Sequence, residues 1–241
     1  MKGNQNHPYA EIVVENQETK VVYQQPYHQL STFFEGWLVR QQSFLEQLLH
    51  SISSDTTNQQ TSLIQQVLAH YQEYYEEKAK IPRNDVFLLF CPPWLSSFER
   101  SLLWVAGYKP YLVFKIVDGA VNDLKAEQTL RMEEVKVETV KKEKELTETL
   151  ARLQESVVAL PMLALARQVG RLMDGEIFSL DLAVEALNTA MLQVIEGANS
   201  LRKSTASKVV EILSPIQIVK FLATAAQFHL QTRRWGLQRD S

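Results

Sequence analysis

The stretch CPPWLSSFERSLLWVAGYKP, Cys91–Pro110, carries the densest set of local structure signals in the chain. Its two prolines stop any preceding element and fix the geometry with which the chain enters the next one. The Ser96-Ser97 pair then offers an N-cap, with Glu99 in the first turn, and Gly107 supplies a left-handed C-cap. The residues between these signals are mostly aliphatic or aromatic. The pattern therefore predicts a helix that lies inside the protein.

The composition is that of a helical globular protein. The chain has 241 residues, of which 45% are hydrophobic and 22% charged, and only eight glycines and eight prolines. So few turn residues favour long helices over a β fold. The single cysteine, Cys91, excludes an internal disulfide, and we expect it to be a small buried hydrophobe. A net charge of −3, no apolar run long enough for a membrane span and no signal-peptide core predict an intracellular protein without direct nucleic-acid or membrane binding.

Helical periodicity extends in both directions from the central stretch. Apolar residues at three- and four-residue steps predict helices over Ser31–Leu49 and Ser62–Lys80. The run Val86–Phe90 is ambiguous between a strand and a connector, and we interpret it as a buried connector. Before residue 31, Glu11–Glu15 and Lys20–Tyr23 could form a small hairpin. A flexible arm laid on the body is the default there, because an isolated hairpin is marginal in water.

A long charged segment follows, from about Asp123 to Glu155. Its apolar positions form a coiled-coil-like seam that includes Leu146, Leu150 and Leu153. The interleaved Glu and Lys residues indicate either a solvated face or a groove for a partner helix. Pro161 is expected to end this helix.

Further helices are predicted over Met162–Met173 and Phe178–Ser200. The segment Leu201–Leu213 either continues the second of these or restarts after a short break. Pro215 then opens a last helix, which Gly236 ends. We therefore predict an all-α fold, a single helical bundle of about seven to nine helices including one long charged helix. Residues 1–30 would form a loosely attached arm, 31–236 the domain and 237–241 a tail.

The residues with catalytic or metal-binding potential form no recognisable site. The five histidines lie at positions 7, 28, 50, 70 and 229 without the spacing of a zinc site, and no phosphate-binding loop or nucleophile motif is present. We therefore do not expect an enzyme. His229 is either a satisfied, semi-buried histidine or a ligand for haem or a metal, which would need a second ligand. Arg233, one turn on, cannot be that ligand because it has no lone pair to offer.

Arg233, Arg234 and Trp235 form a compact basic and aromatic cluster near the end of the last helix. Cations there complement the helix dipole, so a structural role is sufficient to explain them. Contact with an acidic partner or a phosphate is the alternative.

Three segments together carry a family resemblance: FFEGWLVRQQSFLEQLL, PPWLSSFERSLLWVAGYKP and LRKSTASKVVEILSPIQIVKFLATAAQFHLQTRRWG. Within them lie W-L-x-x-Q at Trp37–Gln41, the Phe98–Trp104 motif, L-S-P-x-Q at Leu213–Gln217 and the final R-W-G. In combination these motifs resemble the plant delay-of-germination domain, over nearly the whole of 31–236. That domain occurs alone in seed-dormancy proteins and also as the C-terminal region of TGA-type basic leucine-zipper transcription factors.

The resemblance implies a non-enzymatic regulatory protein of abscisic-acid signalling, seed dormancy or stress response, located in the nucleus and cytoplasm. Its partners would be type 2C phosphatases or transcriptional regulators, and a homodimer is compatible with the family. The family's founding dormancy protein is associated with haem through two histidines four residues apart in the last helix. Here His229 matches the first, but Arg233 stands at the second, so no cofactor is expected. The candidate partner-binding residues are Trp37, Arg40, Arg233, Arg234 and Trp235, with contact surfaces on the arm, the first helix and the seam around Val135–Val157. The alternative is a sensor with haem or a fatty-acyl chain in a pocket between helices.

Overall fold

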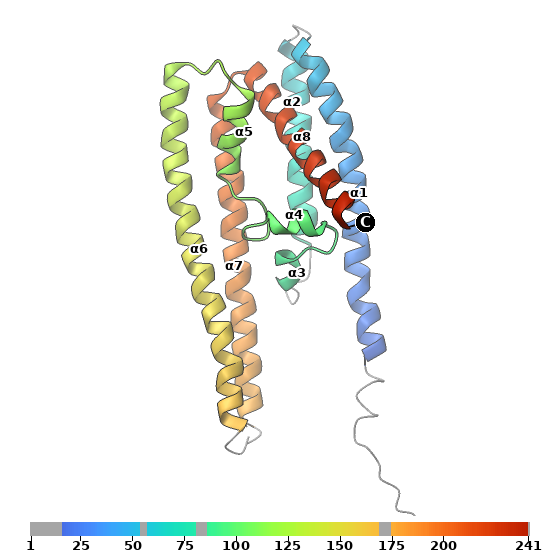
Figure 1. Ribbon diagram of the computed structural model, residues 1–241, viewed down its shortest axis with the longest axis vertical. Coiled ribbons are helices and arrows are strands. Elements are labelled where there is room, and N and C mark those ends of the chain that lie inside the picture. The colour runs from blue at the N-terminus through green and yellow to red at the C-terminus, as the bar shows by residue number, and fades with distance from the viewer. Residues whose placement is uncertain (1–15, 54–56, 81–85, 169–174, 241) are drawn as a thin grey trace, which may run out of the picture.

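The computed structural model describes residues 16–53, 57–80, 86–168 and 175–240, and this part of the chain is built from eight helices without a strand (Figure 1). The helices are α1 (Asn16–Ser53), α2 (Thr57–Lys78), α3 (Val86–Phe90), α4 (Ser97–Ser101), α5 (Leu112–Ala120), α6 (Ala126–Gln168), α7 (Gly175–Ile212) and α8 (Pro215–Asp240). The prediction of an all-α bundle of seven to nine helices, one of them long and charged, is confirmed.

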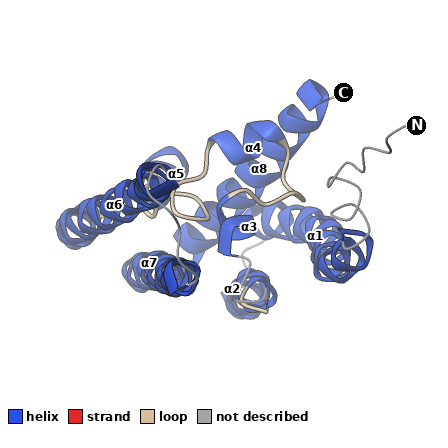
Figure 2. Ribbon diagram, turned by 90° about the horizontal axis from the view of Figure 1, so that it is seen from below, coloured by secondary structure: helices blue, strands red, loops and turns tan. Residues whose placement is uncertain are grey.

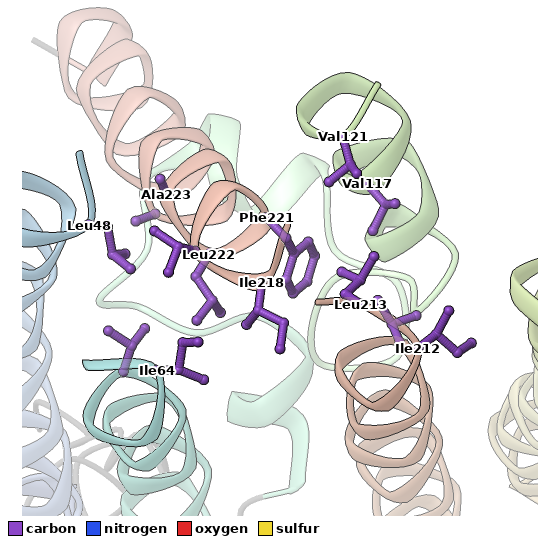
Figure 3. Packing of buried hydrophobic residues seen from close by; sticks show 14 of the residues in the cluster. Leu48, Ile64, Val117, Val121, Ile212, Leu213, Ile218, Phe221, Leu222 and Ala223 are labelled. Atoms are coloured by element: carbon purple, nitrogen blue, oxygen red, sulfur yellow. The ribbon is translucent and has the colours of Figure 1, made fainter. Parts of the chain in front are cut away.

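Helix α8 is the central element of the bundle. It packs against α1, α2, α4 and α5, and Figure 1 shows it crossing obliquely past them. Ile218, Phe221 and Leu222 project from α8 into a core that Leu48 of α1 and Val117 of α5 complete, as Figure 3 shows. All five side chains are nearly inaccessible to water, so the hydrophobic effect holds these helices together.

Helices α6 and α7 form a long antiparallel hairpin beside this core (Figures 1 and 2). The predicted seam is the contact: Leu146, Leu150 and Leu153 of α6 pack in a cluster with buried residues of α7. A hydrogen bond of 3.1 Å between the hydroxyls of Thr139 and Thr205 joins the two helices further along. The seam on α6 is therefore covered by a helix of the same chain.

The helix boundaries differ from the sequence prediction in several places. Helix α1 begins at Asn16, so Lys20–Tyr23 is helical and not a strand, whereas Glu11–Glu15 lies outside the described residues. Figure 1 shows the start of α1 projecting beyond the bundle, which agrees with a loosely attached arm. Pro161 does not end α6, because a proline removes only one hydrogen bond from a helix of 43 residues. The segment 201–212 continues α7 without a break.

The central stretch also differs from its prediction. The cap at Ser96 is confirmed, but α4 ends at Ser101, and Ala106 adopts the left-handed conformation (φ 53°) that was expected of Gly107. Gly107 is needed for another reason, because a Cβ there would lie 2.9 Å from Cζ of Arg202. The short run Val86–Phe90, expected to be a connector, is a helix, and Cys91 is exposed, not buried.

Two basic side chains, Arg202 and Lys78, hold the turn that follows α4. Arg202 of α7 donates from Nε to the carbonyl oxygen of Tyr108 (2.7 Å) and from Nη2 to that of Val105 (2.5 Å). Lys78 of α2 donates to the carbonyl oxygen of Ala106. Both cations are buried, and burial lowers the pKa of Lys78 to about 7. The turn at 105–108 is thus fixed by side chains from distant helices, which no local signal in the sequence reveals.

Candidate functional site

Arg233 joins α8 to two other parts of the bundle. Its Nη1 donates to the carbonyl oxygen of Trp94 (3.0 Å) and to Oε2 of Glu99 (3.1 Å), and its Nη2 donates to Oε1 of Glu35 on α1 (2.5 Å). The guanidinium also lies over the ring of Phe34, 5.5 Å from the centroid. Its side chain is 13% exposed. Arg233 is therefore a structural anchor: Nη1 and Nη2 already have partners within the chain, whereas Nε is buried without one.

Glu99 receives this arginine while it also caps α4. Its Oε2 accepts from the backbone N–H (2.8 Å) and the hydroxyl (2.5 Å) of Ser96, and its own N–H donates to Ser96 Oγ (3.2 Å). This reciprocal pair is a capping box, the arrangement that the sequence SSFE predicts. Only 4% of Glu99 is exposed. Its buried charge is compensated by Arg233 and by the two donors of Ser96.

The last turns of α8 lie directly on α4. A Cβ on Gly236 would be 1.9 Å from Ser96 Oγ, so only glycine allows the two helices to cross this closely. Beyond the crossing, Asp240 accepts from the backbone N–H of Ser97 (2.8 Å) and from its hydroxyl. These hydrogen bonds favour the carboxylate and lower the pKa of Asp240. The end of α8 is therefore held in one position relative to α4.

An exposed aromatic and basic surface lies over this crossing. Trp235 is 47% exposed and meets Phe98 of α4 edge to face, with 6.4 Å between the ring centroids. The guanidinium of Arg239 lies over the ring of Phe98, 5.0 Å from its centroid. Arg234 precedes Trp235 and is exposed, and Leu102, one turn after Phe98, is 40% exposed. We call this surface the α8 patch: Phe98, Leu102, Arg234, Trp235 and Arg239.

The other predicted site residues lie elsewhere. Trp37 is buried between α1 and α2, where it stacks on the ring of His70 (4.5 Å, 9°) and donates from Nε1 to the carbonyl oxygen of that residue (2.9 Å). Arg40 is exposed and pairs with Glu73 (2.8 Å). The structure thus brings Arg234 and Trp235 to one surface with Phe98, places Arg233 beneath it, and separates Trp37 and Arg40 from it.

His229 of α8 is half-buried and packs against aromatic rings. Its ring stacks on Tyr108 (5.5 Å between centroids), and Nδ1 lies 3.3 Å from the hydroxyl of Tyr71. Burial lowers the pKa of His229 to about 4, so the ring is neutral. The donor set does not fit a bis-histidine haem, because the residue one turn on is Arg233, which has no lone pair and is engaged by two carboxylates.

His70 of α2 is a buried histidine, which the sequence did not single out. Neither ring nitrogen has a hydrogen-bond partner. Burial first, then the charges of Arg40 and His229, lower its pKa to about 4. Across the described ranges no group of three or more His, Cys, Asp or Glu side chains is placed to hold a metal ion.

A groove runs between the two helices of the long hairpin. Its lining is mostly charged: Arg131, Glu134, Val135, Glu138, Lys208, Glu211 and Ile212. Such a lining does not suit a fatty-acyl chain, which requires apolar walls. Among the helices of the described chain, none combines the length and apolarity needed to cross a bilayer.

These features define an all-helical protein that presents a rigid basic and aromatic surface. Comparison with known proteins gives its family. A model for the family described as "DOG1: Seed dormancy control" matches residues 42–118. The Arabidopsis thaliana Protein RESPONSE TO ABA AND SALT 1 is 42% identical over 211 residues, which cover 83% of this chain and 92% of that protein. Protein ZW2 from the same plant is 38% identical over 216 residues, covering 86% and 96%.

Transcription factor TGA5, also of Arabidopsis thaliana, is 24% identical over 205 residues, covering 83% of this chain and 61% of the factor. The chain belongs to the DOG1 seed-dormancy family, as its motifs predicted. These relatives support a regulatory role in a plant. Their names point to regulatory proteins and not to enzymes.

Proposed function

We propose that this chain is a non-enzymatic regulatory protein of abscisic-acid signalling, seed dormancy or stress response that acts by binding protein partners at the α8 patch. Two relatives support the physiological setting, one named for its response to abscisic acid and salt and the other a transcription factor. The second relative supports a role in the nucleus, including transcriptional regulation. The protein would act in the cytoplasm as well. The partners would be type 2C phosphatases or transcriptional regulators.

The observation that carries this proposal is the exposed Trp235 on a rigid support. Tryptophan and arginine are the residues that most often dominate the energetics of protein interfaces. Trp235 has Phe98 against it and two arginines, Arg234 and Arg239, nearby. Because Gly236 and Asp240 fix the end of α8 on α4, little conformational entropy is lost when a partner binds.

The charges of the patch indicate the chemistry of the partner. Arg234 and Arg239 are both exposed, whereas Asp240, the neighbouring acid, is engaged by Ser97. An acidic segment with an apolar or aromatic side chain would satisfy both the arginines and Trp235.

A purified type 2C phosphatase is the first probe, titrated calorimetrically against the full chain. Trp235→Ala is expected to weaken binding at least tenfold, because truncating a central tryptophan typically costs about 2 kcal/mol or more. The double variant Arg234→Glu/Arg239→Glu is expected to weaken binding by a larger factor at low salt than at high salt, because salt screens the charges. The matched control is Arg152→Ala on α6, an exposed arginine remote from the patch. Equal binding by the patch variants and the control would contradict the proposed surface, and no binding by the wild type would exclude that phosphatase as the partner.

A further inference from the structure

Lys78 carries a buried amine that lacks a counter-ion. It is the last residue of α2, and only 4% of it is exposed. Its Nζ donates to the carbonyl oxygen of Ala106, and within the described part of the chain it has no second acceptor and no ion pair with a carboxylate. An ammonium at this place would offer three donors to one acceptor, without a neighbouring negative charge.

Arg202 of α7 makes an ammonium at Lys78 still less favourable. It is buried as well, and it donates to the carbonyl oxygens of Val105 (2.5 Å) and Tyr108 (2.7 Å), on either side of Ala106 in the sequence. Two like charges would then face one turn with little water to screen them. Burial first, and then the charge of Arg202, lowers the pKa of Lys78 to about 7. The closed turn thus accepts the neutral amine and disfavours its protonated form.

The other titratable groups of the surrounding helices do not supply the missing negative charge. Glu143 of α6 is buried and attracts Arg202, but its Oε1 accepts from the backbone N–H of Tyr111 (2.6 Å). Glu99 of α4 is already paired with Arg233. The short helix α3, which shares a core cluster with the turn, is entirely apolar. Burial raises the pKa of three phenols in this region, so they are neutral: Tyr74, Tyr75 and Tyr108.

The turn is therefore sensitive to the charge of one side chain. We propose that Lys78 and the turn at 105–108 form a proton-sensitive latch, in which the neutral amine holds the turn closed and protonation opens it. Because Lys78 ends α2 and Lys80, two residues on, is largely exposed, the charged side chain can reach water. The carbonyl oxygen of Ala106 then lacks its donor, although the residue is 1% exposed and has left-handed backbone. An unpaired buried carbonyl is unfavourable, so the turn that joins α4 to α5 loosens, whatever the α8 patch binds.

The two pKa values of Lys78 set the direction and the size of the effect. The pKa is about 7 in the closed turn and returns to the ordinary 10.5 once the amine meets water. Because the open form binds the proton more tightly, a fall in pH favours opening over the range between these values. The opening equilibrium constant should rise roughly 50-fold from pH 9 to pH 7 and level off below about pH 7. The buried histidines titrate below this window, so they contribute little.

NMR of the full chain with ¹³C-labelled lysine tests the titration directly, because the Cε signal of each lysine reports its protonation. The Lys78 signal is identified by its loss in Lys78→Met. It is expected to titrate near pH 7, well below the signals of surface lysines. A Lys78 signal that titrates together with the surface lysines would overturn the proposal.

Amide exchange, corrected for the intrinsic rate at each pH, tests the opening of the turn. Its reporter is the N–H of Trp104, which donates to the carbonyl oxygen of Gly107 across the turn (2.8 Å). In the wild type the protection of this amide should fall roughly 50-fold from pH 9 to pH 7. Lys78→Arg is charged at both pH values and Lys78→Met at neither, so these variants should not show the fall.

The matched control is Lys80→Arg, at the exposed lysine two residues beyond Lys78, which should behave as the wild type. Circular dichroism shows which variants fold. The latch would be overturned by a wild type whose Trp104 amide shows no dependence on pH in this window. The same dependence in a folded Lys78 variant as in the wild type would overturn it equally.

Discussion

Replacement of Arg233 by alanine should destabilise the fold far more than replacement of its neighbour Arg234. Arg233→Ala leaves the carboxylate of Glu99, of which 4% is exposed, without its counter-ion. Breaking a buried ion pair by removing one partner costs about 3 to 5 kcal/mol. Ser96 still donates twice to Glu99, so we expect the lower end, about 3 kcal/mol. The lost contact with Glu35 adds little, because that carboxylate is 59% exposed.

Denaturant unfolding monitored by circular dichroism measures this loss. In thermal unfolding of a chain of this size, a loss of about 3 kcal/mol corresponds to a fall in Tm of roughly 6 to 12 °C. Arg234→Ala, with an exposed side chain, should stay within about 0.5 kcal/mol of the wild type. A double-mutant cycle with Glu99→Gln should give a coupling of about 1 kcal/mol or more. A loss below about 1 kcal/mol for Arg233→Ala, or no coupling to Glu99, would refute the role of Arg233 as the anchor of α8.

Two further predictions concern stability. Gly236→Ala should destabilise by about 1 to 3 kcal/mol, because its Cβ overlaps Ser96 Oγ. Helix propensity alone would favour alanine by about 1 kcal/mol, so a rise in Tm would show that α4 and α8 do not cross this closely. Acidification should destabilise the fold between about pH 6.5 and 4. Burial lowers the pKa of His70 and His229 to about 4 in the folded chain. The same histidines in the unfolded chain take up protons from about pH 6.5, so protons favour the unfolded state in this range. Each histidine contributes up to about 1.4 kcal/mol of unfolding free energy per pH unit in that window. His70→Gln should therefore reduce the slope of the unfolding free energy against pH. An unchanged slope would contradict the burial of His70 in its neutral form.

The features that local sequence determines were predicted well. Periodicity predicts a helix over 31–49, which lies within α1, and the Ser96-Ser97 pair predicts the N-cap that Ser96 forms. The seam at Leu146 and Leu150 also follows from spacing. These patterns depend on residues within one or two turns of each other, which is the range that a sequence pattern reports.

The features that distant residues determine were not predicted. Gly107 was predicted to be a C-cap from its local sequence. Its actual role, which is to leave room for Arg202, depends on a residue in α7 and could not be predicted locally. Trp37 was taken as a contact residue, since periodicity does not show that His70 lies against its ring. The α8 patch forms only because Phe98 of α4 meets Trp235 of α8, and neither segment alone indicates the other. The cluster Arg233, Arg234 and Trp235 was identified, but not that Arg233 lies beneath the surface that the other two present.

The measurement that tests the account most directly is quantitative affinity purification from plant seed tissue with the wild type, Trp235→Ala and the control Arg152→Ala as baits. Circular dichroism must first show that all three chains fold alike. The account predicts that a defined set of proteins, rich in acidic segments, is retained by the wild type and by Arg152→Ala and is depleted with Trp235→Ala. The same proteins recovered in equal amounts with all three baits would contradict the claim that the α8 patch is the surface through which this protein acts.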